Sequence, residues 1–107
     1  MKNREENDVF FAIADPTRRA ILDMLSSGNL ALKDISSNFE ITRTAVSKHI
    51  KILQDADLIE SSKLGRNTVY QISPKPLVEV QEWLQTYSEF WDKKLKDLKN
   101  FVENNDF

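Results

Sequence analysis

The 107-residue chain contains no cysteine and a single histidine, His49. A zinc site of the usual kind is built mainly from thiolate and imidazole ligands, so this chain has no means of assembling the four-ligand cage. The lack of cysteine also excludes a disulfide framework, which agrees with a location in the cytoplasm. From its length of 107 residues we expect one domain with a modest core. A chain of this size is near the point at which dimerisation adds stability.

Long apolar runs are absent as well. No stretch approaches the length of a membrane span, and residues 1–6, MKNREE, lack the apolar segment of a signal peptide. The chain has neither a glycine-rich phosphate loop nor a Gly-x-Ser-x-Gly motif, and the pattern around His49 lacks a nucleophile partner. These absences argue against a membrane protein and against an enzyme, and no cofactor is expected.

Among the residues that are present, the stretch 41–53, ITRTAVSKHIKIL, is the most informative. Val46, Ile50 and Leu53 recur at helical spacing and mark a buried side, and Thr42 is placed to cap the start of the helix. The opposite side bears hydroxyls and cations without a carboxylate. Arginine can bridge two acceptors of guanine, and serine and threonine adapt to bases or phosphates. This side therefore suits DNA, with a plain solvated face as the alternative.

The segments on either side strengthen the DNA interpretation. Leu32, Ile35 and Phe39 form a short apolar stripe, and we expect a two-residue turn at 40–41 between two helices. Residues 58–63 and 67–73 resemble two strands joined around Gly65. The sequence thus predicts a helix-turn-helix followed by a β-hairpin, whose tip is expected to contact a neighbouring DNA backbone or minor groove.

Three motifs in this order resemble the ArsR/SmtB family of bacterial winged-helix repressors. Residues 14–22, ADPTRRAIL, resemble the opening of its second helix, residues 44–53 resemble its recognition helix, and residues 56–59 with 65–66 resemble its entry to the wing. The resemblance covers residues 9–73. It implies a mainly α winged helix-turn-helix of order α-α-α-α-β-β-α, and a homodimeric repressor that binds operator DNA and is released by a small-molecule or protein effector.

The family's metal-sensing members use cysteines before the recognition helix, or histidine and carboxylate ligands on the last helix. Here the earlier position reads ALKDI from residue 31, and the segment after Pro76 has no histidine. The chain therefore resembles members without those ligands, and a purely carboxylate site is the remaining route to metal binding.

Residues expected to contact DNA lie on the recognition helix and in the wing. They are Thr42, Arg43, Thr44, Ser47, Lys48, His49, Lys51, Lys63, Arg66 and Asn67. The net charge of −2 does not oppose this, because residues 41–73 hold five basic side chains against three acidic ones. We expect the His49 ring at the edge of the buried face with a nitrogen toward backbone or phosphate. We expect Arg18 and Arg19 to pair with nearby carboxylates, with a phosphate contact as the alternative.

The last third, residues 75–103, reads as a single dimerisation helix, whose apolar pattern runs for about 25 residues from Leu77. The expected interface comprises Val9, Phe10, Ile13, Leu77, Val80, Leu84, Tyr87, Trp91, Leu95, Leu98 and Val102, while Trp83 and Phe90 widen the face toward the winged core at 8–73. Both parts form one domain, 1–107. Two alternatives remain: a winged-helix module that binds another protein through this helix, or a small-molecule pocket lined by Trp83, Tyr87 and Trp91.

Overall fold

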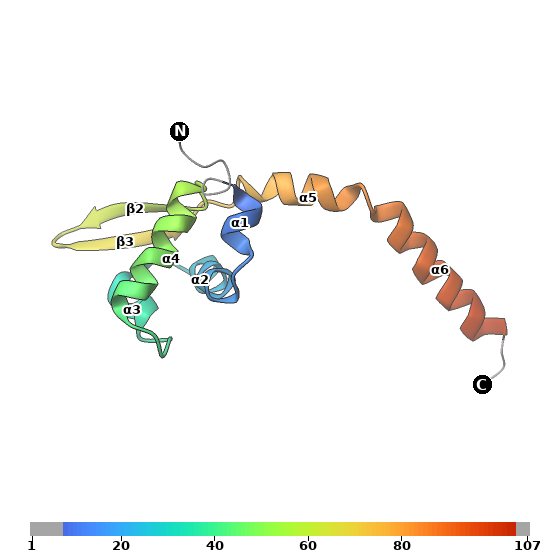
Figure 1. Ribbon diagram of the computed structural model, residues 1–107, viewed down its shortest axis with the longest axis horizontal. Helices are drawn as coiled ribbons and strands as arrows, with labels where there is room; N and C mark the ends of the chain where they lie inside the picture. Colours follow the sequence, from blue (N-terminus) through green and yellow to red (C-terminus); the bar gives the residue numbers. More distant parts are fainter. Residues whose placement is uncertain (1–7, 105–107) are drawn as a thin grey trace.

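The computed structural model describes residues 8–104, so the expectation for residues 1–6 lies outside it. The elements are α1 (Val9–Ile13), α2 (Pro16–Ser26), β1 (Leu30–Ala31), α3 (Leu32–Ser36), α4 (Arg43–Asp55), β2 (Ile59–Leu64), β3 (Asn67–Ile72), α5 (Leu77–Gln85) and α6 (Ser88–Asn104). Figure 1 shows the β2–β3 hairpin extending from one side of the helical body, with α5 and α6 leading away from the other. The predicted helix-turn-helix and wing are both present.

The core lies where α2, α3 and α4 meet the base of the hairpin. Val46, Ile50 and Leu53 are at most 1% exposed, which confirms the buried face predicted for α4. They pack in one cluster with apolar residues of the neighbouring elements, including Ile21 and Ile35. Burying a large apolar side chain contributes about 1.5–3 kcal/mol, so this cluster is the main force that holds α4 to the body.

Both ends of α4 are capped by local hydrogen bonds. The Thr42 hydroxyl accepts from the backbone N–H of Ala45 at 3.0 Å, as its N-cap position predicts. At the other end the Leu58 N–H donates to the Leu53 carbonyl, and Asp57 adopts a left-handed φ of 61°. This is the hydrogen-bonded reversal with which many helices end. It directs the chain from α4 straight into β2.

The sheet has three antiparallel strands in the order β1-β3-β2. Leu64 pairs with Asn67 beside the hairpin turn, where Gly65 has a φ of +65°, as a tight two-residue turn requires. The predicted strands are confirmed to within one residue at each end. Strand β1 was not expected, because two residues are too few to show a period; it pairs Leu30 with Tyr70.

The connection between α3 and α4 is longer than the predicted two residues. Helix α3 ends at Ser36, and α4 begins only at Arg43. The Ser37 hydroxyl and the Asn38 amide both donate to the Asp34 carbonyl, at 2.9 and 2.8 Å. Such side-chain hydrogen bonds compete with a continuing helix, which explains the early end. Phe39 still packs against the core, although it lies outside the helix.

The single C-terminal helix predicted over 75–103 is wrong, because the structure has two helices there. After Gln85 the N–H groups of Thr86 and Tyr87 donate to carbonyls only three residues earlier, and the Ser88 hydroxyl donates to the Gln85 carbonyl at 2.9 Å. This tight turn ends α5 and starts α6 in a new direction (Figure 1). The apolar period continues through the break, so the pattern alone does not reveal it.

Candidate nucleic-acid interface

The outer face of α4 presents the polar side chains that the sequence assigned to DNA. Arg43, Thr44, Lys48 and Lys51 are exposed, and Ser47 is half-buried. Lys51 lies 3.5 Å from Asp55, in an exposed pair that stabilises the helix by less than about 1 kcal/mol. In residues 8–104, no ion pair engages Arg43 or Lys48. Their charge is therefore available to an external anion.

The wing adds a second set of exposed groups. Lys63, Arg66 and Asn67 surround the hairpin turn, and all three are exposed. The structure brings Arg43 of α4 and Asn67 of β3 to the walls of one hollow of about 260 Å³. The start of α4 and the residues beside the hairpin turn therefore border one continuous surface.

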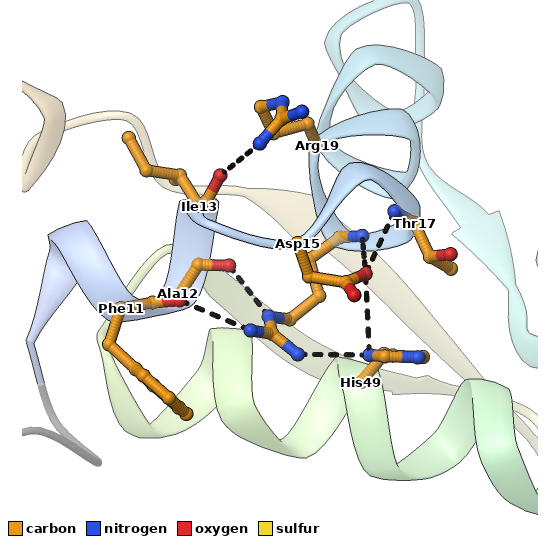
Figure 2. A network of polar contacts seen from close by, with 8 residues as sticks. Phe11, Ala12, Ile13, Asp15, Thr17, Arg19 and His49 are labelled. Carbon is orange, nitrogen blue, oxygen red and sulfur yellow. Dashed lines mark hydrogen bonds and ion pairs between the residues drawn. The ribbon is translucent and has the colours of Figure 1, made fainter.

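His49 departs from its predicted orientation. Its Nδ1 lies 3.1 Å from Nη1 of Arg18 and 3.9 Å from Oδ2 of Asp15, so this nitrogen faces the start of α2 (Figure 2). Because arginine stays protonated and can only donate, Nδ1 must accept the hydrogen bond, which places the ring proton of neutral His49 on Nε2. Nδ1 is thus occupied by a side chain, rather than offered to backbone or phosphate.

The partner of His49, Arg18, is buried, with 7% of its surface exposed. Its Nε donates to the Ala12 carbonyl at 2.7 Å, and its Nη2 donates to the Phe11 carbonyl at 3.1 Å. The expectation that the Arg18 side chain pairs with a carboxylate, or else with a phosphate, is therefore wrong, because its hydrogen-bond partners are two carbonyls and a histidine nitrogen. It joins the end of α1 to α4, and its guanidinium also lies over the Phe11 ring. Arg19 likewise donates to a carbonyl, that of Ile13.

A sequence signal for this inward arginine was available. Arg18 precedes Ile21, Leu22 and Leu25 by three, four and seven residues, which places it on the buried face of α2. A charged residue at such a position needs buried acceptors. What the pattern does not contain is their identity, since the acceptors belong to α1 and α4.

Asp15 caps α2 beside this network. Its Oδ2 accepts from the backbone N–H groups of Thr17 and Arg18, at 2.8 and 3.1 Å (Figure 2). Partial burial tends to raise the pKa of Asp15, but the hydrogen bonds from the backbone N–H groups of Arg18 and Thr17, together with the positive charge of the Arg18 guanidinium, outweigh it and lower the pKa. The carboxylate form is therefore favoured in the folded chain.

A pH dependence follows from this lowered pKa. A carboxyl group of this kind stabilises the fold above its unfolded pKa, and that contribution is lost as the pH falls through its folded pKa. Asparagine caps helices well but does not titrate, so the stability advantage of the wild type over Asp15→Asn should shrink on acidification. Urea unfolding of both proteins between neutral pH and about pH 3 measures this difference in the free energy of unfolding. A constant difference across that range would contradict the assignment.

The predicted dimer surface is partly used within the protomer. Val9 is 3% exposed and belongs to the core, so its assignment to the interface is wrong. The rings of Phe10 and Trp83 pack edge-on with their centroids 5.6 Å apart, and Leu77 and Val80 pack against the core. These contacts attach α5 to α1. The short first helix and α5 are therefore one structural unit, with part of their apolar surface already covered.

Further along, the apolar side chains are uncovered. Leu84, Tyr87, Trp91, Leu95, Leu98 and Val102 are between 45% and 65% exposed. Phe90, expected against the winged core, is 53% exposed and packs on Trp91 instead. Trp83 meets Tyr87, and Trp91 lines a hollow at the α5–α6 junction.

In residues 8–104, no three histidine, cysteine, aspartate or glutamate side chains are grouped closely enough to hold a metal ion. None of the helices in this range is long and apolar enough to cross a membrane.

Comparison with known proteins gives consistent matches. The family described as bacterial regulatory protein, arsR family, matches residues 15–61. The transcriptional repressor SdpR of Bacillus subtilis is 35% identical over 83% of this chain and 99% of its own length. The HTH-type transcriptional regulator Rv2034 of Mycobacterium tuberculosis is 32% identical over 94% and 92%. A crystal structure of an ArsR family transcriptional regulator superposes with a TM-score of 0.72 at 34% identity, covering 86% and 95% of the two chains.

Proposed function

The chain belongs to the arsR family of bacterial regulatory proteins, and from this membership we propose that it is a homodimeric repressor that binds an inverted-repeat operator in double-stranded DNA. It is a transcriptional regulator and not an enzyme. The observation that carries the proposal is the outer face of α4, where cations without an ion pair stand beside hydroxyls on a firmly packed helix. Because its target is DNA, we place the protein in the bacterial cytoplasm.

In this proposal α4 enters the major groove with its N-terminal turns leading, as recognition helices do. Arg43, Thr44 and Ser47 contact base edges, while Lys48 and Lys51 contact phosphates. The wing residues Lys63, Arg66 and Asn67 contact the flanking backbone or minor groove. We assign His49 no direct contact through Nδ1, because that atom is bound to Arg18.

The homodimer is supported by the uncovered apolar stripe of α5 and α6. Six large side chains there are about half exposed or more in the single chain, and leaving that much apolar surface in water is costly. A two-fold axis beside these helices would present two α4 helices. If they lie about 34 Å apart, they meet successive major grooves and read an inverted repeat.

Selection of bound duplexes from a randomised DNA pool, at about 0.15 M salt, tests the function directly. We expect enrichment of an imperfect inverted repeat whose half-sites lie one helical turn apart. If the folded protein enriches no sequence, the proposal of a sequence-specific repressor fails.

The selected duplex then separates reading residues from positioning residues. Arg43→Ala is expected to weaken binding to it by about 1–3 kcal/mol and to relax the preference at one base pair, since a bidentate contact to guanine is lost. Lys51→Ala, the matched control on the same helix, should weaken selected and random duplexes equally. Equal losses on both duplexes for Arg43→Ala, measured by fluorescence anisotropy, would reject its reading role.

A further inference from the structure

A hollow on the proposed DNA side is bounded by four elements, of which β3 is distant in the sequence from the other three. Its volume is about 260 Å³, and it lies between the end of β1, α3, the start of α4 and the beginning of β3. The lining residues are Ala31, Leu32, Lys33, Arg43, Asn67, Thr68 and Tyr70. Three of these, Lys33, Thr68 and Tyr70, were not assigned to DNA from the sequence.

The side chains that line this hollow include cations and neutral donors but no acid. Five of its seven lining residues carry a side-chain hydrogen-bond donor, two of them cationic, and none carries a carboxylate. Another hollow of this chain differs, because Asp57 and Glu60 line it beside Lys75. A site with several donors, two positive charges and no acid favours an anion with several acceptor oxygens.

These donors are also without partners inside the protein. In the part of the chain that the structure describes, no hydrogen bond or ion pair engages the side-chain ends of the five donor residues. Lys33 and Arg43 are exposed, while Thr68 and Tyr70 are half-buried and held by the sheet. The two sheet residues are two positions apart and so lie on the same face of β3.

The position of the hollow indicates which anion reaches it. Arg43 opens the recognition helix and Asn67 follows the wing turn, so the hollow spans the space between the two elements proposed to contact DNA. If α4 enters the major groove as proposed, the sugar-phosphate backbone at the edge of that groove would pass beside the helix start and the wing. A backbone phosphate brings two unesterified oxygens to this point.

We propose that this hollow binds a phosphoryl group, and that its occupant is a backbone phosphate of the operator beside the groove that α4 enters. Lys33 supplies the charge from α3, and the hydroxyls of Thr68 and Tyr70 orient the phosphate oxygens from β3. The three are positioning residues, because a phosphate contact fixes register without reading sequence. The choice of occupant rests on the proposed function, whereas the phosphoryl site itself is tested without it.

Lys33→Ala, Tyr70→Phe and the control Lys96→Ala are compared on the selected duplex over a range of salt concentrations. Lys96 is an exposed lysine of α6, a helix that lies far from α3 (Figure 1). Loss of one phosphate contact per subunit should reduce the log–log salt slope of a Lys33→Ala dimer by about 2 and its affinity at 0.15 M salt by about tenfold. Tyr70→Phe should lose affinity without a change of slope, and Lys96→Ala should match the wild type. A wild-type slope for Lys33→Ala overturns a backbone phosphate of the operator as the occupant.

Two further arms identify the source of the phosphoryl group. In the first, single phosphates of the duplex are replaced by neutral methylphosphonates. One replacement per half-site should weaken the wild type but have no further effect on Lys33→Ala. In the second, inorganic phosphate is titrated at constant ionic strength while the Thr68 and Tyr70 amide resonances are followed. Saturating shifts without any sensitive methylphosphonate position would keep the phosphoryl site but overturn DNA as its occupant.

The phosphate titration also distinguishes a failure of the phosphoryl site from a failure of the proposed function. If the wild type selects no duplex, the proposed function fails, yet phosphate shifts that disappear in Lys33→Ala still support the site. If Lys33→Ala changes neither DNA binding nor the resonance shifts that phosphate causes, the site is rejected.

Discussion

Replacing Arg18 with leucine is expected to lower the free energy of unfolding by about 2–4 kcal/mol, although the residue lies outside the proposed DNA surface. Leucine fills part of the space but leaves the Ala12 and Phe11 carbonyls and His49 Nδ1 without their donor. The hydrogen bond to the Ala12 carbonyl is buried, and a buried polar atom that loses its partner costs about 1–3 kcal/mol, whereas the two partly buried acceptors add less. Urea unfolding at neutral pH measures the loss.

Arg19→Leu is the matched control for this prediction. Arg19 is the next residue, has the same side chain and makes one hydrogen bond to a carbonyl, that of Ile13, but it is exposed. Its replacement should therefore change stability by about 0.5 kcal/mol or less. Equal effects of the two substitutions would show that the buried network does not hold α1 against α4.

Placing a charge on the apolar stripe of α6 is expected to separate the dimer. Leu95 is 65% exposed in the single chain, so Leu95→Glu leaves the protomer core intact. Across a dimer interface the same charge would be buried without a partner, which is strongly unfavourable. We expect monomers in sedimentation experiments, and a loss of operator affinity of about 100-fold or more, because each half-site then binds alone.

Asn100→Glu is the control for this second prediction. It adds the same charge to α6 at an exposed polar position, two residues away from both Leu98 and Val102 and so off their stripe. It should remain dimeric and bind the operator as the wild type does. A dimeric Leu95→Glu protein with full affinity would show that α6 does not hold the partner subunit. A folded wild type that is monomeric would reject the homodimer and assign the stripe to a different protein.

The features that the sequence determined by itself depend on interactions between residues a few positions apart. A helical period is visible in Val46, Ile50 and Leu53, and the cap at Thr42 spans three residues. The wing required only alternating residues and a glycine that tolerates φ of +65°. Because these rules act over one or two turns, the linear sequence contains all the information that they need.

The features that the sequence left open depend on which surfaces meet in three dimensions. An apolar pattern shows that Val9 is buried but not against what, since hydrophobic burial has no direction. Only the fold places it in the core, while Leu95 remains exposed for a partner. Polar contacts behave in the same way: Arg18 meets a histidine 31 residues away, and the phosphoryl site joins α3 to β3. Hydrogen bonds act over about 3 Å, so their partners are chosen by the tertiary structure and not by spacing in the chain.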